Sequence, residues 1–100
     1  NCEGAIVDAI HKSEGTAGVI LNAGAYTHYS LAIRDAIAAI DAPVIAVHLT
    51  HAHSREEFRH KSVLAAVCRG VVCGFGSKSY LLALLALASP ESLARIGLDG

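Results

Sequence analysis

Three short apolar runs separated by segments of helical periodicity constrain the fold of this chain more than any other feature. The runs occupy residues 18–22 (GVILN), 44–48 (VIAVH) and 70–74 (GVVCG), and they are rich in β-branched residues. Continuous apolar runs of this length are typical of strands that are covered on both faces. Strands that alternate with helices form a parallel sheet with right-handed crossovers. The sequence therefore predicts an α/β fold with a parallel sheet.

Helix signals fill the segments between these runs. The first helix is expected to begin near Asn1 and Glu3 and to end before Gly15. Ser30 is the expected N-cap of a second helix that reaches Ile40. Helical turns are expected within residues 53–67, a helix over residues 77–88 whose run 80–88 is buried, and a last short helix over residues 89–97.

Charge and cysteine content limit which partners and which cellular compartment the sequence favours. The formal net charge is −1, so no basic surface argues for nucleic acid or an anionic membrane. The longest apolar run, residues 80–88, is shorter than the roughly 20 residues that a membrane span needs. Cysteines are odd in number and lack CxxC spacing, which favours reduced thiols in a cytoplasmic protein without a secretory leader.

The start of the chain suggests a partial domain. The sequence contains no Met and enters a helical pattern at once. We therefore expect residues 1–100 to form a single partial domain that belongs to a longer protein.

Polar residues stand where the first two predicted strands end. Asn22 ends the first strand and His48 ends the second, and the polar loops 23–29 and 49–54 follow them. Ligand sites of open parallel sheets lie beyond the carboxyl ends of the strands, so both loops are expected to line one crevice. An amide, imidazoles for proton transfer, and the backbone N–H groups of Leu49 and Thr50 would suit an anionic ligand.

Simpler interpretations exist for the same residues. Asn22 before Ala-Gly is also a common turn residue, and His28 could cap the helix that begins near Ser30. A further hypothesis is a metal-dependent hydrolase that uses the closely spaced histidines His48, His51 and His53. Their spacing supplies no evident carboxylate or Cys partner, so no metal is expected.

Three motifs in order carry a resemblance to a known family. NAGAYTHYSLAIRDAI, VHLTHAHSREEFRHKSVLA and GVVCGFGSKSYLLAL together resemble the type II 3-dehydroquinate dehydratases, and the similarity spans about Asn1 to Leu87. The resemblance implies a flavodoxin-like, three-layer α/β/α fold. It also implies a lyase of the shikimate pathway or of quinate catabolism, which dehydrates 3-dehydroquinate to 3-dehydroshikimate through an enolate without metal or organic cofactor.

The resemblance also implies roles for individual residues. His48 matches the general acid that protonates the departing hydroxyl. Substrate-binding residues of the family match Asn22, His28, Asp35, Leu49, Thr50 and Arg59. Among these, Asn22 and the backbone N–H groups of Leu49 and Thr50 would hold the substrate carboxylate, while His28 and Arg59 would bind the ring hydroxyls. Asp35 matches a residue that reaches the site of a neighbouring subunit in a trimer, and four trimers form the dodecamer of the family.

Several departures from the family pattern affect catalysis. The family begins with a strand carrying a GPNLNLLG-like motif and a lid with an Arg and the catalytic Tyr, and none of these occurs in this sequence. Ala46 stands where the family has a Glu that charges the acid His, and His51 replaces an Asn. Residues 1–100 would thus be the C-terminal two-thirds of the domain, inactive alone and marginal as a monomer. A non-catalytic homologue that binds small acids or serves in assembly is the alternative.

Overall fold

The structure is a computed structural model that describes residues 2–49 and 62–89, and it is a layered α/β fold. In chain order the elements are α1 (Glu3–Lys12), β1 (Val19–Leu21), the 3₁₀ helix η1 (Gly24–His28), α2 (Leu31–Ala39), β2 (Val44–His48), the 3₁₀ helix η4 (Ala65–Val67), β3 (Gly70–Cys73) and α3 (Lys78–Leu87). The strands form a parallel sheet in the order β1-β2-β3. The predicted alternation of strands and helices is confirmed, whereas most of the expected 53–67 segment and the helix expected over 89–97 lie outside the described residues.

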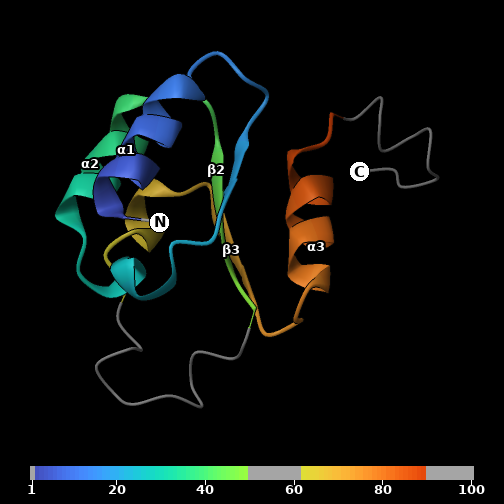
Figure 1. Cartoon of the computed structure of the whole chain (residues 1–100). Helices are drawn as coiled ribbons and strands as arrows, with labels where there is room; N and C mark the ends of the chain where they lie inside the picture. Colours follow the sequence, from blue (N-terminus) through green and yellow to red (C-terminus); the bar gives the residue numbers. More distant parts are fainter. Residues whose placement is uncertain (1, 50–61, 90–100) are drawn as a thin grey trace.

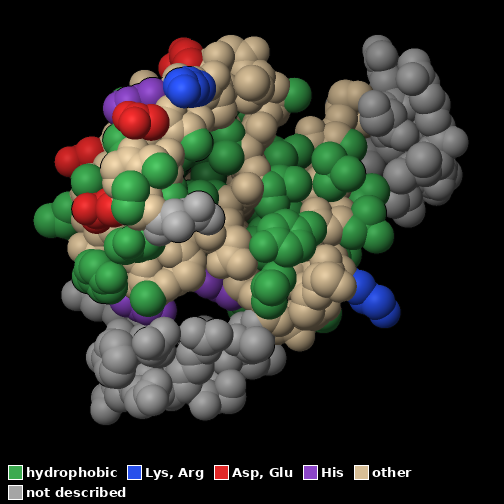
Figure 2. Space-filling view, viewed as in Figure 1, with side chains coloured by type: hydrophobic (Ala, Val, Ile, Leu, Met, Phe, Trp, Pro, Cys, Tyr) green, Lys and Arg blue, Asp and Glu red, His purple; other side chains and the backbone are tan. Residues whose placement is uncertain are grey.

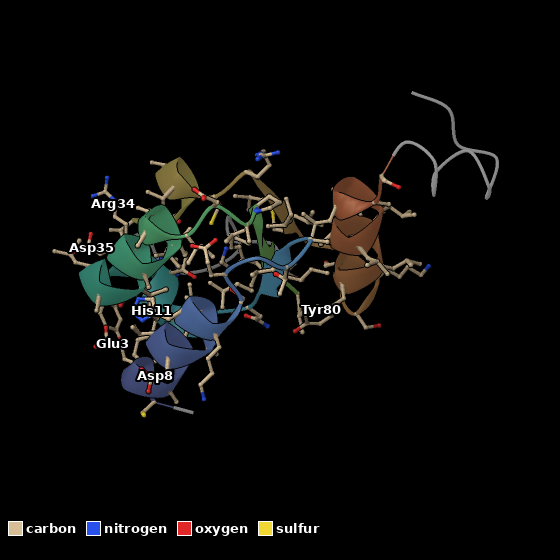
Figure 3. All side chains as sticks on the ribbon, turned by 90° about the horizontal axis from the view of Figure 1, so that it is seen from above. Glu3, Asp8, His11, Arg34, Asp35 and Tyr80 are labelled. Carbon is tan, nitrogen blue, oxygen red and sulfur yellow. The ribbon has the colours of Figure 1, made fainter. Side chains whose placement is uncertain are left out.

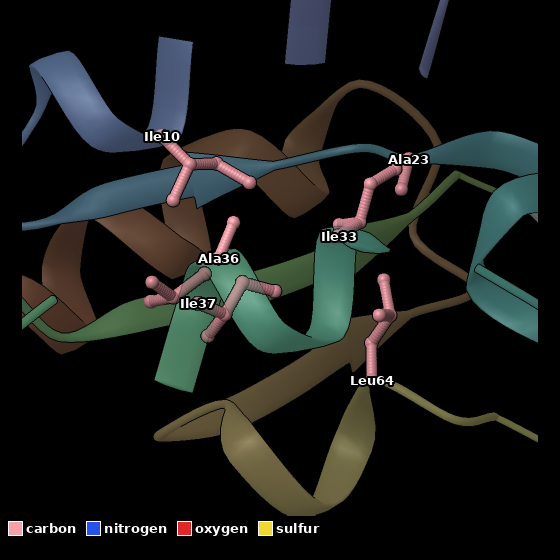
Figure 4. Close-up of a cluster of buried hydrophobic side chains, with 7 residues drawn as sticks. Ile10, Ala23, Ile33, Ala36, Ile37 and Leu64 are labelled. Carbon is pink, nitrogen blue, oxygen red and sulfur yellow. The ribbon is translucent and has the colours of Figure 1, made fainter. Parts of the chain in front are cut away.

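The sheet is covered on both faces. Figure 1 shows α1 and α2 on one side of the strands and α3 on the other. Side chains alternate along β2, because successive residues of a strand point to opposite faces. Val44 packs with the isoleucines of α1 and α2, while Ile45 and Val47 pack with Ala83 of α3. The core on the α1 and α2 side is the larger one (Figure 4).

A buried serine joins the starts of the two helices on that side. The Ser30 hydroxyl accepts a hydrogen bond from the Ile33 N–H at 3.1 Å, which confirms the predicted N-cap of α2. The same hydroxyl donates to the Glu3 carboxylate in the first turn of α1. Ser30 is 1% exposed, and its hydrogen bond with the Ile33 N–H is buried, while the one to Glu3 is part-buried. The helix starts are therefore fixed to each other through one side chain.

The sequence predicts a buried helix over residues 80–88, and the predicted burial is wrong. α3 forms, but Tyr80, Leu81, Leu82 and Leu84 are 39–57% exposed. An outer-layer helix buries only the stripe that contacts the sheet, which here consists of Ser79 and Ala83. Apolar side chains therefore gather on the surface over α3 (Figure 2). Among the described residues, no helix is both long and apolar enough to cross a membrane.

β1 forms one edge of the described sheet. It pairs with β2 alone, in the register Val19 to Val44 and Leu21 to Ala46. An open apolar groove of about 780 Å³ runs beside this edge and the last turns of α3, lined in part by Gly18, Ile20 and Leu87. An edge of this kind leaves backbone groups unpaired on one side, which makes it a place for further strand pairing.

Two glycines tie the loop after β3 to the loop after β2. The Gly74 N–H donates to the His48 carbonyl at 3.1 Å, and the Gly76 N–H donates to the Leu49 carbonyl at 2.8 Å. Both glycines have positive φ, +89° for Gly74 and +56° for Gly76, a conformation that residues with a Cβ disfavour. Backbone hydrogen bonds from the loop after β3 therefore hold His48 and Leu49 in place.

Replacing Gly76 with Ala should destabilise the protein and loosen this connection. At a positive φ an alanine costs roughly 1–2 kcal/mol, and that strain weakens the hydrogen bond to Leu49. Urea unfolding of the full-length protein would measure the lower stability, and amide hydrogen exchange at residue 76 would measure the loosening. Gly4→Ala is the matched control, because Gly4 lies in α1 with open space around it. It should raise the stability by up to roughly 1 kcal/mol. Equal effects of both substitutions on stability would contradict the conclusion that the backbone conformation at position 76 requires glycine.

Ser79 and Ser30 offer a second comparison, since both are buried but, within the part of the chain that the structure describes, only Ser30 makes side-chain hydrogen bonds. The Ser79 hydroxyl has no hydrogen-bond partner among the described residues. Ser79→Ala should therefore raise the free energy of unfolding by about 1 kcal/mol, because it removes a desolvated group that gains nothing from burial. Ser30→Ala should lower it by about 1–3 kcal/mol, because it removes the cap and leaves Glu3 without its partner. Denaturant titrations that ranked the variants in the opposite order would refute this explanation.

Candidate functional site

All three described strands end at one edge of the sheet. The parallel register sets Leu21 beside Ala46 and His48 beside Cys73. The chain leaves this edge at Asn22 after β1, at Leu49 after β2 and at Gly74 after β3. Two residues predicted from the sequence as site residues, Asn22 and His48, are thus brought to the same edge, where parallel sheets place their ligand sites.

Asn22 is both a turn residue and an exposed polar group. Its Oδ1 accepts a hydrogen bond from the Gly24 N–H at 3.2 Å, which is the turn role that the sequence offered as the simpler interpretation. Its Nδ2 donates to the hydroxyl of Tyr80 on α3 at 3.1 Å. Asn22 also lines an open groove of about 540 Å³ between η1 and α1, together with Gly24 and Tyr26. The carboxamide is therefore oriented and accessible at once.

His48 is half-buried at the end of β2. Strand periodicity puts its side chain on the face shared by Val44 and Ala46, the face that α1 and α2 cover. Ala46 is 3% exposed and lies two residues before His48. The position at which the resembled family has a Glu is therefore buried and on the same face as the histidine.

His28 ends η1, next to the chain that returns after residue 61. Thr27 is 1% exposed, and its carbonyl accepts a hydrogen bond from the Val63 N–H at 2.8 Å. This bond fixes the turn that carries the half-buried His28. The N-cap of α2 is supplied by Ser30.

The remaining predicted site residues differ in their burial and position. Asp35 is exposed on α2, and Figure 3 shows it on the opposite side of the molecule from Tyr80. Leu49 is half-buried, and its carbonyl is held by Gly76. Thr50 and Arg59 lie outside the described residues.

The proposed histidine metal site also falls largely outside the described part of the chain, because His51 and His53 belong to residues 50–61. Within residues 2–49 and 62–89, no three His, Cys, Asp or Glu side chains come together as metal ligands. Burial raises the pKa of the Cys68 thiol, which packs against the larger core and stays neutral. Cys68 therefore contributes to the packing of the larger core.

Sequence reasoning missed Tyr80. The crevice was expected from the loops after the first two strands, but the third strand ends at the same edge and leads through residues 74–77 into α3. Tyr80 lies in the first turn of that helix and contacts Asn22. The signal was present in the sequence as a phenol at the start of an otherwise apolar run, four residues after the second glycine of the loop GFG.

Comparison with known proteins agrees with this architecture. The family model described as "Dehydroquinase class II" matches residues 1–88. Proteins named 3-dehydroquinate dehydratase are similar in sequence. The one from Ruegeria pomeroyi is 58% identical over 95 residues, which cover 91% of this chain and 64% of that protein. The one from an Exiguobacterium species is 62% identical over 87 residues, which cover 87% of this chain and 60% of that protein.

Solved structures show the same similarity. A type II dehydroquinase from Butyrivibrio crossotus superposes with a TM-score of 0.85 at 49% identity, covering 89% of this chain and 63% of that chain. The type II dehydroquinase from Propionibacterium acnes gives a TM-score of 0.81 at 39% identity, covering 87% of this chain and 65% of that chain. This chain thus spans about 60–64% of the length of the curated relatives that it matches. Its three-layer parallel fold is the flavodoxin-like fold of these enzymes, and the chain belongs to the class II dehydroquinase family.

Proposed function

We propose that the protein containing this chain is a lyase that removes water from 3-dehydroquinate to give 3-dehydroshikimate. The observation that carries the proposal is the meeting of Asn22 and His48 at the carboxyl edge of the sheet, in a chain that the class II dehydroquinase model matches over residues 1–88. A carboxamide donor and an imidazole at one edge provide the two functions that this substrate needs, an anchor for its carboxylate and an acid for its hydroxyl.

The proposed mechanism divides the work between the two loops. Asn22 Nδ2 and the backbone N–H groups of Leu49 and Thr50 bind the ring carboxylate. This contact holds the ring with its leaving hydroxyl toward His48, which donates a proton as the C–O bond breaks. His28 and Arg59 donate hydrogen bonds to the other ring hydroxyls. The elimination passes through an enolate and needs no metal or organic cofactor, because the ketone next to C2 already acidifies the proton that is lost.

The base that takes the C2 proton is proposed to lie outside residues 1–100. The resemblance places it on a Tyr of a lid, and these residues contain no counterpart of that lid motif. In this proposal residues 1–100 are the C-terminal two-thirds of one catalytic domain, which agrees with the 60–64% of the relatives' length that they span. The lid would also exclude water from the closed site.

Location and assembly complete the proposal. The three cysteines are free thiols, which suits the reducing cytoplasm, where we place the reaction. Asp35 is exposed on α2, so it is available to a neighbouring subunit. This accessibility supports a trimer in which Asp35 reaches the next active site, with four trimers in a dodecamer.

A binding or assembly module is a second candidate, favoured by one observation. Ala46 is buried on the same face as His48, at the position where the family uses a Glu to charge the acid. Without that carboxylate less of the histidine is protonated, and so able to donate, near neutral pH. Turnover of the full-length protein separates the two candidates. A lyase should form the conjugated enone at a measurable rate, and Ala46→Glu should raise that rate by favouring the protonated histidine. A binding module should bind the substrate but form no enone, either as the native protein or as the Ala46→Glu variant.

His48→Ala is the direct test of the proposed acid. In the full-length protein it should lower kcat by on the order of 100-fold or more, the usual contribution of a general acid, while the binding of 3-dehydroquinate persists. The rise in ultraviolet absorbance of the conjugated enone measures turnover. His11→Ala is the matched control, because His11 lies exposed in the last turn of α1 and should leave kcat unchanged. A near-normal kcat for His48→Ala would remove His48 from the mechanism.

A polypeptide of residues 1–100 by itself should show no turnover in the same assay. The reason is chemical, because these residues lack the lid motif that is proposed to supply the base. Adding a family-like N-terminal segment should restore activity, since the Asn22 and His48 side of the site is already arranged. Turnover by residues 1–100 at ordinary enzyme rates would contradict the assignment of the base and require a base within these residues.

A further inference from the structure

Tyr80 reaches the carboxyl edge of the sheet from the helix on the opposite face to α1 and α2. Its hydroxyl lies 3.1 Å from Asn22 Nδ2, although 58 positions separate the two residues in the sequence. Figure 3 shows Tyr80 on the side of α3 that faces the rest of the molecule. The start of α3 is itself fixed, because the Gly76 N–H donates a hydrogen bond to the Leu49 carbonyl and Ser79 is completely buried. The phenol is therefore held in place beside the candidate site.

The two hydrogen bonds of the Asn22 side chain determine which way its carboxamide faces. Oδ1 accepts from the Gly24 N–H at 3.2 Å, and Nδ2 donates to the Tyr80 hydroxyl at 3.1 Å. A flipped carboxamide would set its NH₂ group against the Gly24 N–H, which is an unfavourable meeting of two donors. Nδ2 carries two hydrogens, and the contact with Tyr80 uses one of them. The second hydrogen can donate to a ligand oxygen in a direction that Tyr80 and Gly24 fix together.

We infer that Tyr80 is a positioning residue that preorganises the Asn22 carboxamide to bind a ligand carboxylate. The inference rests on the proposed function for the identity of that ligand, the ring carboxylate of 3-dehydroquinate. Without the Tyr80 hydroxyl, the Asn22 side chain keeps, among the described residues, the hydrogen bond from the Gly24 N–H, and its carboxamide turns more freely. Ligand binding then has to order the Asn22 side chain, and this loss of side-chain entropy weakens the affinity.

Tyr80→Phe removes the hydroxyl that Asn22 donates to and keeps the aromatic ring. In the full-length protein it should raise KM for 3-dehydroquinate about three- to tenfold, the scale of one hydrogen bond, and change kcat by less than about twofold, since the contact acts on binding. Tyr29→Phe is the matched control. Tyr29 is 62% exposed, its ring packs edge-on against Tyr26, and it should leave both constants unchanged.

A double-mutant cycle tests whether Tyr80 acts through Asn22. If it does, Tyr80→Phe should weaken binding in the native background and have no further effect once Asn22→Ala is present. Binding can be followed with quinate as the probe, because quinate carries the same ring carboxylate and does not react. Additive losses in the two backgrounds would overturn the inference, because they would mean that Tyr80 contributes independently of Asn22.

The side-chain amide signals of Asn22 in NMR spectra give a readout that needs no turnover. Tyr80→Phe should shift these signals in the ligand-free protein, whereas Tyr29→Phe should not. Unchanged Asn22 signals, or shifted signals with unchanged quinate affinity, would overturn the inference. If the native protein binds quinate through Asn22 and Tyr80 but never forms the enone, the lyase proposal fails and the positioning role of Tyr80 is supported. Failure of the two proposals can thus be told apart.

Discussion

The parallel pairing of β2 with both of its neighbours is the constraint on which the rest of the structure depends. Because all three strands run in one direction, their carboxyl ends meet at one edge, and residues far apart in the sequence become neighbours there. β2 also supplies the centre of both cores, since alternate residues pack toward α1 and α2 or toward α3. A shift of β2 by one residue would exchange its faces, bury the wrong side chains and turn His48 to the other side.

Hydrogen bonds between loops convert this shared edge into an ordered site. The loop after β3 holds the carbonyls of His48 and Leu49, and the carbonyl of Thr27 binds the chain where it re-enters at Val63. The polar groups at the edge are therefore carried by backbone segments that hydrogen bonds from neighbouring loops hold in place. Such support is what a ligand-binding site needs, because ligand contacts contribute less when the groups that make them must first be ordered.

Local signals explain which features could be predicted from sequence. The strands, the Ser30 cap and the position of Asn22 and His48 at strand ends follow from residue types within a few positions of each other, and the structure confirms them. The exposure of Leu81 and Leu84 could not be predicted, because a helix that is apolar on all sides carries no pattern to show which side meets the sheet. The contact between Tyr80 and Asn22 joins two elements across 58 positions, and only the packing of α3 on the sheet brings them together.

A crystal structure of the full-length protein with quinate bound would show whether the carboxyl edge of the sheet holds a ligand carboxylate. We predict that a carboxylate oxygen accepts hydrogen bonds from Asn22 Nδ2 and from the Leu49 N–H, that Tyr80 keeps its contact with Asn22, and that His48 faces the ring. A quinate molecule bound elsewhere, or one bound at this edge with its carboxylate beyond hydrogen-bond distance of Asn22, would contradict the proposed carboxylate site.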